Sequence, residues 1–160
     1  MTEKRAYVVQ LLESSMKRAQ QIALLRYELE HPAHVSPEEM IGAMSFAHGD
    51  SSAKAMGHVS NKTLYIALNY REQTDKVNAE AMNEVAARLV KLEQEQNRLM
   101  HYVSLLDQRQ ERAIRLFYFD GIPWGEVAQQ IGVALRTVHK IRTEAIAQLT
   151  KMYEFTGAGK

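Results

Sequence analysis

The side chains with the most potential for chemistry lie close together near the end of the chain. Between residues 136 and 143, six side chains are cationic or can form hydrogen bonds: Arg136, Thr137, His139, Lys140, Arg142 and Thr143. No acidic residue interrupts this stretch before Glu144. Arginine and lysine hold phosphates and pair with guanine O6 and N7, and threonine also binds phosphates. The pattern suits DNA, although a solvated helix surface can have the same composition.

Two helices and a glycine turn are expected to position these side chains. The first helix begins at Pro123 and Trp124, and Gly132 ends it in the left-handed conformation. The second helix begins near Leu135, and its expected inward residues are Leu135, Val138, Ile141, Ala145 and Leu149. This order predicts a helix-turn-helix, whose second helix enters the major groove of DNA. The spacing alone leaves DNA binding and plain helical packing equally open.

A further helix is predicted directly before this pair. Asp107 and Gln110 form a pattern similar to a capping box, which opens the helix. The helix ends at Asp120 and Gly121. Trp124 is expected to close the small three-helix core rather than to stack on a base.

The strongest periodic signal lies in the middle of the chain. Its members are Met82, Val85, Leu89, Leu92, Gln96, Leu99, Val103 and Leu106, spaced alternately by three and four residues. Such a heptad seam requires a partner helix, and its polar member Gln96 can fix the register. The partner is either the first helix of the same chain or a second copy, and the seam does not decide between them.

Residues typical of helix starts and ends also occur in the N-terminal part of the chain. Apolar residues at steps of three and four predict a helix over residues 2–30, with an inward face of Val8, Leu12, Ala19, Ile22, Leu25 and Leu29. His31-Pro32 ends it. Ser36, Pro37 and Glu39 then open a short helix with a capping box, and residues 47–60 have the composition of a loop. Helix resumes near Lys62.

The composition gives no support for catalysis or for export. With 46% hydrophobic and 24% charged residues, the 160-residue chain is not expected to be disordered as a whole. No run of about 18 apolar residues predicts a membrane span, and no apolar signal core follows the N-terminus, so we expect a cytoplasmic protein. The chain has no cysteine, which excludes a thiol nucleophile and a cysteine zinc site. His31 and His34 match no structural zinc spacing, so no metal site is expected. The sequence shows no serine with a partnered base, no carboxylate dyad and no glycine-rich phosphate loop, so no cofactor and no enzyme activity are expected.

The C-terminal sequence resembles a known family. Residues 116–128 read LFYFDGIPWGEVA, and IGV at 131–133 and RTV at 136–138 follow. This order resembles the promoter-recognition helix-turn-helix of bacterial sigma factors over about residues 106–153. With a helical N-terminal region of this length, the chain resembles phage-encoded sigma-like transcriptional regulators of the ArpU/RinA type. The resemblance implies activation of late genes, with promoter DNA and host RNA polymerase as partners.

Two residues depart from the family pattern. Pro123 stands where serine or threonine is usual, and Ala134 stands where serine usually opens the recognition helix. Each change removes a side-chain N-cap, which contributes about 1 kcal/mol. Proline compensates in part, because it has no backbone N–H to satisfy.

These observations define an all-α protein in two parts. Residues 1–105 are expected to form a helical, coiled-coil-like region, and residues 106–160 a sigma-like helix-turn-helix domain. The predicted function is sequence-specific, double-stranded DNA binding by a homodimeric transcriptional regulator in the cytoplasm of a bacterial host. Two alternatives stay open: a phage small-terminase-like DNA-packaging protein, and a helical adaptor that binds a protein instead of DNA.

Overall fold

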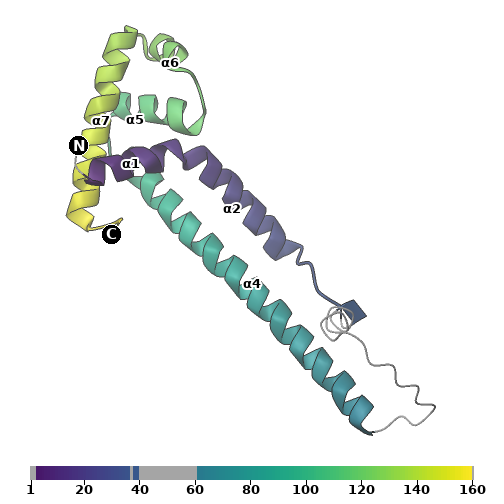
Figure 1. Ribbon diagram of the computed structural model, residues 1–160. Coiled ribbons are helices and arrows are strands. Elements are labelled where there is room, and N and C mark those ends of the chain that lie inside the picture. Colours follow the sequence, from purple (N-terminus) through teal and green to yellow (C-terminus); the bar gives the residue numbers. More distant parts are fainter. Residues whose placement is uncertain (1–2, 37, 40–60, 160) are drawn as a thin grey trace. The chain divides into compact units, whose positions relative to one another are not determined.

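All regular structure in the described part of the chain is helical (Figure 1). The structure is a computed structural model that describes residues 3–36, 38–39 and 61–159. Its elements are α1 (Glu3–Glu13), α2 (Ser15–Glu30), α4 (Asn61–Ser104), α5 (Gln108–Ile114), the π-helical turn η1 (Arg115–Phe119), α6 (Trp124–Ile131) and α7 (Leu135–Thr156). The all-α prediction is confirmed, and no strand occurs among these residues.

The chain forms two compact units. The first combines the residues up to Leu24 with those from Leu89 onward, and the second is Leu25–Arg88. The first unit therefore takes residues from both sides of the expected boundary between residues 105 and 106. The prediction that residues 106–160 form a separate domain stays a prediction.

The main core of the first unit joins the N-terminal helix to the C-terminal helices. Helix α1 packs against α7, as Figure 1 shows. The buried residues of this main core are Val8, Leu11, Leu12, Leu99, Val103, Leu106, Ile114, Tyr118, Ala145, Ile146, Leu149 and Tyr153. They come from α1, α4, α5, η1, α7 and the turn after α4, so burial of apolar surface holds these elements together.

Aromatic rings fill one side of the main core. Tyr153 is 1% exposed, and its ring meets the rings of Tyr102 and Tyr7 at centroid distances of 4.9 and 5.8 Å. Burial raises the pKa of the Tyr153 hydroxyl, and burial also raises the pKa of Tyr7. The Tyr153 hydroxyl has no hydrogen-bond partner among the described residues, so this side chain contributes to packing as an apolar ring.

The single helix expected over residues 2–30 is in fact two helices that meet at Ser14. The Ser14 hydroxyl donates to the backbone oxygen of Gln10 at 2.7 Å, a bond of the kind that bends helices. In addition, the Arg18 guanidinium donates to the backbone oxygen of Leu11 at 3.2 Å and to Ser14 Oγ at 2.7 Å. The Leu11 carbonyl thus takes a side-chain partner at the bend.

The buried face of α2 differs from the predicted apolar face. Its buried residues are Ser15, Arg18 and Ile22, whereas Ala19 is exposed, so the prediction for Ala19 is wrong. The change of direction at Ser14 turns Arg18 inward, where its guanidinium donates to Gln96 Oε1 at 2.8 Å. Arg18 Nε also lies 3.7 Å from the Glu95 carboxylate. A buried charge is tolerated here because its hydrogen bonds are formed.

The C-terminal half of the heptad seam finds its partner within the chain. Leu99, Val103 and Leu106 are buried in the main core together with Val8 and Leu12 of α1. Gln96, the polar member of the seam, accepts the Arg18 hydrogen bond. The partner of this half of the seam is therefore the first helix of the same chain, and not a second copy.

The second unit confirms two of the predicted helix boundaries. Helix α2 ends at Glu30, directly before His31-Pro32, and α4 begins at Asn61, one residue before the predicted start. The Ser36–Glu39 capping box is also confirmed, because Glu39 N donates to Ser36 Oγ at 3.2 Å and Ser36 N donates to a Glu39 carboxylate oxygen at 3.0 Å. The helix predicted beyond Glu39 and the loop at 47–60 lie outside the described residues.

Replacing Gln96 tests whether its side chain serves a coiled-coil seam or the buried arginine. In a simple apolar seam, Gln96→Leu would stabilise the protein. We expect the opposite here, a loss of about 1–2 kcal/mol, because Arg18 loses a hydrogen-bond partner while it stays buried. Urea unfolding monitored by circular dichroism measures this free energy. Gln94→Leu, at an exposed position of the same helix, is the matched control and should change stability by less than about 0.5 kcal/mol. A Gln96→Leu protein more stable than the native chain would contradict the assignment.

Candidate DNA interface

The helix that supports the interface begins at Asp107 as predicted. The Asp107 carboxylate accepts from Arg109 N at 3.0 Å and from Gln110 N at 2.9 Å, which caps α5. The reciprocal half of the capping box is not formed, because the Gln110 side chain is buried and its Oε1 has no partner among the described residues. The helix continues through η1 and ends at Asp120 and Gly121, where Gly121 has φ 71°.

Helix α6 and the turn after it have the expected helix-turn-helix geometry. Pro123 is the N-cap residue of α6, one position before the helix, so it caps through its backbone oxygen alone. Gly132 ends the helix with φ 76° and ψ 37°, a left-handed conformation that glycine adopts without strain. Gly132 N and Val133 N both donate to the Ala128 oxygen, at 2.9 and 3.0 Å, and this pair of bonds closes the turn. Helix α7 then begins at Leu135, as predicted.

A small second core fixes α6 against α7. Its buried members are Ala113, Val127, Ala128, Val138 and Ile141, which come from α5, α6 and α7. Trp124 is half-buried and stacks on Phe117 with ring centroids 3.9 Å apart and planes 13° apart. The ring thus packs in the core, as expected for Trp124.

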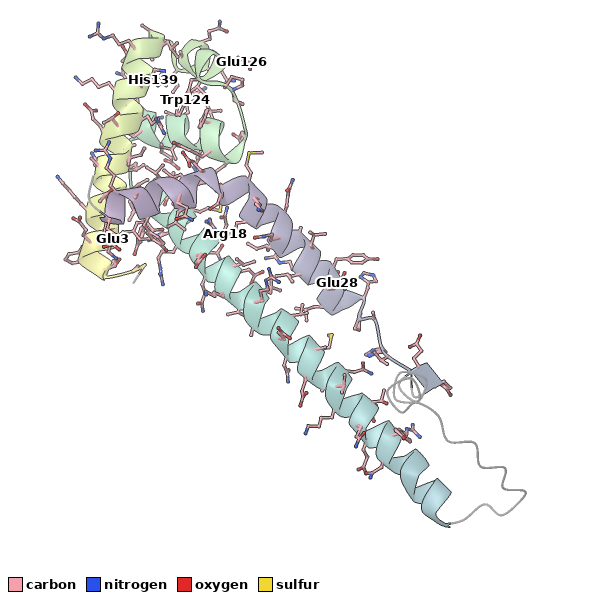
Figure 2. All side chains as sticks on the ribbon, in the orientation of Figure 1. Glu3, Arg18, Glu28, Trp124, Glu126 and His139 are labelled. Carbon is pink, nitrogen blue, oxygen red and sulfur yellow. The ribbon has the colours of Figure 1, made fainter. Side chains whose placement is uncertain are left out.

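Five of the six predicted interface residues are exposed on α7. They are Arg136, Thr137, His139, Lys140 and Thr143. Because Val138 and Ile141 are buried on the other side of the helix, the packing of the small core directs the intervening residues outward. Figure 2 labels His139 on this part of α7, with Trp124 and Glu126 on α6. The His139 and Trp124 rings lie 5.9 Å apart.

Arg142, the sixth predicted residue, is held by the protein itself. Its Nε donates to the Tyr118 hydroxyl at 2.9 Å, and its guanidinium carbon lies 6.0 Å from the Tyr118 ring and 5.8 Å from the Trp124 ring. The side chain is half-buried, so its orientation is restricted before any ligand binds. The sequence analysis did not identify Tyr118 as a partner of Arg142, because it placed this residue only within the segment 116–128 that resembles the sigma factors.

The outward position of Leu135 corrects a prediction. Leu135 was expected to face inward, but its side chain is 47% exposed and belongs to neither core. As the first residue of α7, it follows directly on the turn, and Val138 is the first apolar residue of the helix that reaches the small core. Periodicity alone does not show that Leu135 lies at the very start of the helix. The apolar stripe of α7 reaches the small core only one turn later, at Val138.

Local charge on α7 favours anions near the start of the helix. The first turn contains no acidic residue, and the positive end of the helix dipole adds to Arg136. Lys140 has one acidic neighbour, Glu144, at 4.0 Å on the exposed surface. An exposed pair of this kind contributes little and leaves Lys140 able to bind another anion.

Neither a cluster of metal ligands nor a membrane-spanning helix occurs among the described residues. No group of three or more histidine, aspartate or glutamate side chains could hold a metal ion in this part of the chain. His31 stacks on Tyr27 with ring centroids 4.2 Å apart, and His34 is exposed. No described helix is both long and apolar enough to cross a membrane.

Comparison with known proteins agrees with the C-terminal geometry. Residues 96–149 match the family described as sigma-70, region 4. Neither the curated proteins nor the solved structures gave a match for the chain. Residues 96–149 therefore form a helix-turn-helix similar to region 4 of the sigma-70 factors, and the modules of that family bind DNA and act in transcription.

Restoring the missing cap on α7 should stabilise the protein. Ala134 is the N-cap residue, with φ −68° and ψ 150° and no side-chain hydrogen bond. A serine in this conformation accepts from a free backbone N–H of the first turn, so Ala134→Ser should add about 0.5–1 kcal/mol to the free energy of unfolding. Urea unfolding measures the change.

Ala147→Ser is the matched control, because it makes the same substitution at an exposed position inside α7. There serine only lowers helix propensity, and a loss of up to about 0.5 kcal/mol is expected. Equal effects at the two positions would show that Ala134 does not limit the start of the helix.

Proposed function

We propose that the protein is a sequence-specific DNA-binding transcriptional regulator that inserts the start of α7 into the major groove. The observation that carries this proposal is the outward face of α7, where Arg136, Thr137 and Lys140 are exposed on a helix whose opposite side is locked into the small core. The N-terminal residues of a recognition helix contact base edges, and cations beside them bind phosphates. The match to sigma-70 region 4 supports the same assignment.

The role in the cell follows from the resemblance of the sequence to phage sigma-like regulators of the ArpU/RinA type. We place the protein in the cytoplasm of a bacterial host, as an activator of late phage genes that contacts host RNA polymerase. The residues that support DNA binding in this role are Arg136, Thr137, His139, Lys140, Arg142 and Thr143. Two of them are already held within the protein: Arg142 donates to the Tyr118 hydroxyl, and the Thr143 hydroxyl donates to the His139 backbone oxygen.

Removing two cations from the exposed face tests the interface. Arg136→Ala combined with Lys140→Ala should weaken binding of the full chain to phage intergenic DNA at least tenfold. If both side chains contact phosphates, the slope of log affinity against log salt concentration should fall by about two. Gel shift over a series of salt concentrations measures both quantities.

A second double variant controls for the loss of charge. Lys17→Ala combined with Lys91→Ala removes two exposed cations from α2 and α4, away from the proposed interface. Its affinity and salt slope should match those of the native chain. The site assignment is wrong if the two double variants bind DNA equally well. A chain that binds no duplex DNA at any salt concentration favours the adaptor alternative.

We further propose that the regulator is a homodimer, which would place two recognition helices on adjacent half-sites. An exposed apolar surface at the far end of α7 supports this. Phe155 is 92% exposed and forms one wall of a groove of about 320 Å³, which is also lined by Tyr102, Leu105 and Met152. In a two-fold dimer the same patch meets itself, so each copy supplies both the ring and the groove. This contact leaves the start of α7 free for DNA.

The mass of the assembly tests the dimer and the packaging alternative together. Sedimentation equilibrium of the native chain should give two copies, and Phe155→Ser should shift the equilibrium at least tenfold toward the monomer. Val90→Ser, a change at another exposed apolar residue of the same unit, should leave the dimer intact. A ring of many subunits would instead support a small-terminase-like protein.

A further inference from the structure

Leu135 is out of place as an ordinary core residue of α7. The other large aliphatic residues of this helix, Val138, Ile141, Ile146 and Leu149, are between 0% and 9% exposed. Leu135 is 47% exposed and packs in neither core. About half of its surface is therefore available to a ligand.

The surroundings of Leu135 define the kind of ligand. It is the first residue of α7, next to the exposed side chains of Arg136 and Thr137, and no acidic residue lies in the same turn. In a helix-turn-helix this end of the second helix approaches the edges of the base pairs. The apolar group that base pairs present in the major groove is the C5-methyl of thymine.

We propose that Leu135 reads a thymine in the operator by packing against its C5-methyl group. The inference rests on the proposed function, because it assumes that the start of α7 enters the major groove. It assigns different tasks to neighbouring residues: Arg136 and Lys140 supply affinity through charge, whereas Leu135 supplies selectivity through an apolar contact. Cytosine and uracil lack the methyl group, so they leave the leucine in contact with polar atoms or water.

Replacement of thymine by uracil isolates the methyl group from every other feature of the base pair. The full-length protein first selects its binding sequence from a library of random duplex DNA. Each thymine of the selected duplex is then changed to deoxyuridine in turn. For the native chain we expect one thymine position at which this change weakens binding about fourfold, the effect of losing one buried methyl group.

The leucine is tested at the same position. In Leu135→Ala, the thymine and uracil duplexes should bind equally well, whereas Leu135→Met, which keeps an apolar side chain of similar length, should retain most of the preference. Leu24→Ala, which truncates another exposed leucine far along the sequence, should behave as the native chain. Circular dichroism confirms that the variants keep their helices, as expected for truncation of exposed side chains.

The outcomes separate the inference from the proposed function. A selected operator with no uracil-sensitive position, or one whose sensitivity survives in Leu135→Ala, overturns the role of Leu135 while DNA binding stands. Selection that enriches no sequence at all overturns both. The proposed contact is supported if Leu135→Ala no longer distinguishes thymine from uracil, whereas the native chain, Leu135→Met and Leu24→Ala still do.

Discussion

The burial of one apolar stripe along α7 holds the candidate interface in place. Near its start, Val138 and Ile141 pack into the small core with α6, and further along, Ala145, Leu149 and Tyr153 pack into the main core. Both cores thus act on a single rigid element. Since helical side chains three and four residues apart share a face, the burial of this stripe directs the cationic residues to the opposite side.

The cationic face is accordingly a consequence of packing and needs little support of its own. The ion pair of Lys140 with Glu144 is exposed and therefore weak, so this side chain can reorient toward another anion. Arg142 is different, because Tyr118 and Trp124 restrict its guanidinium. Pre-organisation of this kind lowers the entropy lost when a ligand binds. In the proposed function, Lys140 can adapt to the phosphate backbone of DNA, whereas the restrained Arg142 can help to fix the position of the helix along the duplex.

Much of the helix-turn-helix could be predicted from sequence because its determinants are local. Asp107 caps a helix, Gly132 provides a left-handed residue, and Val138 continues an apolar stripe, and each depends on a few neighbouring residues. The exposure of Leu135 could not be predicted in this way. Periodicity assigns it to the inward face, but the position of α6 decides where burial begins.

The N-terminal helices show the same limit more strongly. The burial of Arg18 depends on a group that it meets only in the folded chain, because Gln96 lies 78 positions further along the sequence. Likewise, the heptad pattern in α4 predicted an apolar surface that packs against another helix. The pattern could not show that α1 packs against its C-terminal half. The exposure of five candidate site residues on α7 could be predicted from the sequence, whereas the Tyr118–Arg142 contact could not.

The extent of the family match shows how the chain builds on the module it carries. The match spans residues 96–149, which include every buried member of the small core. The main core is divided differently, since Val8, Leu11 and Leu12 come from α1, and Tyr153 follows the matched segment. The helix-turn-helix therefore closes its own small core around α6, but the rest of α7 requires α1 as a packing partner. In this chain α1 is a structural part of the unit that presents the proposed DNA-binding face, even though it lies more than a hundred residues earlier in the sequence.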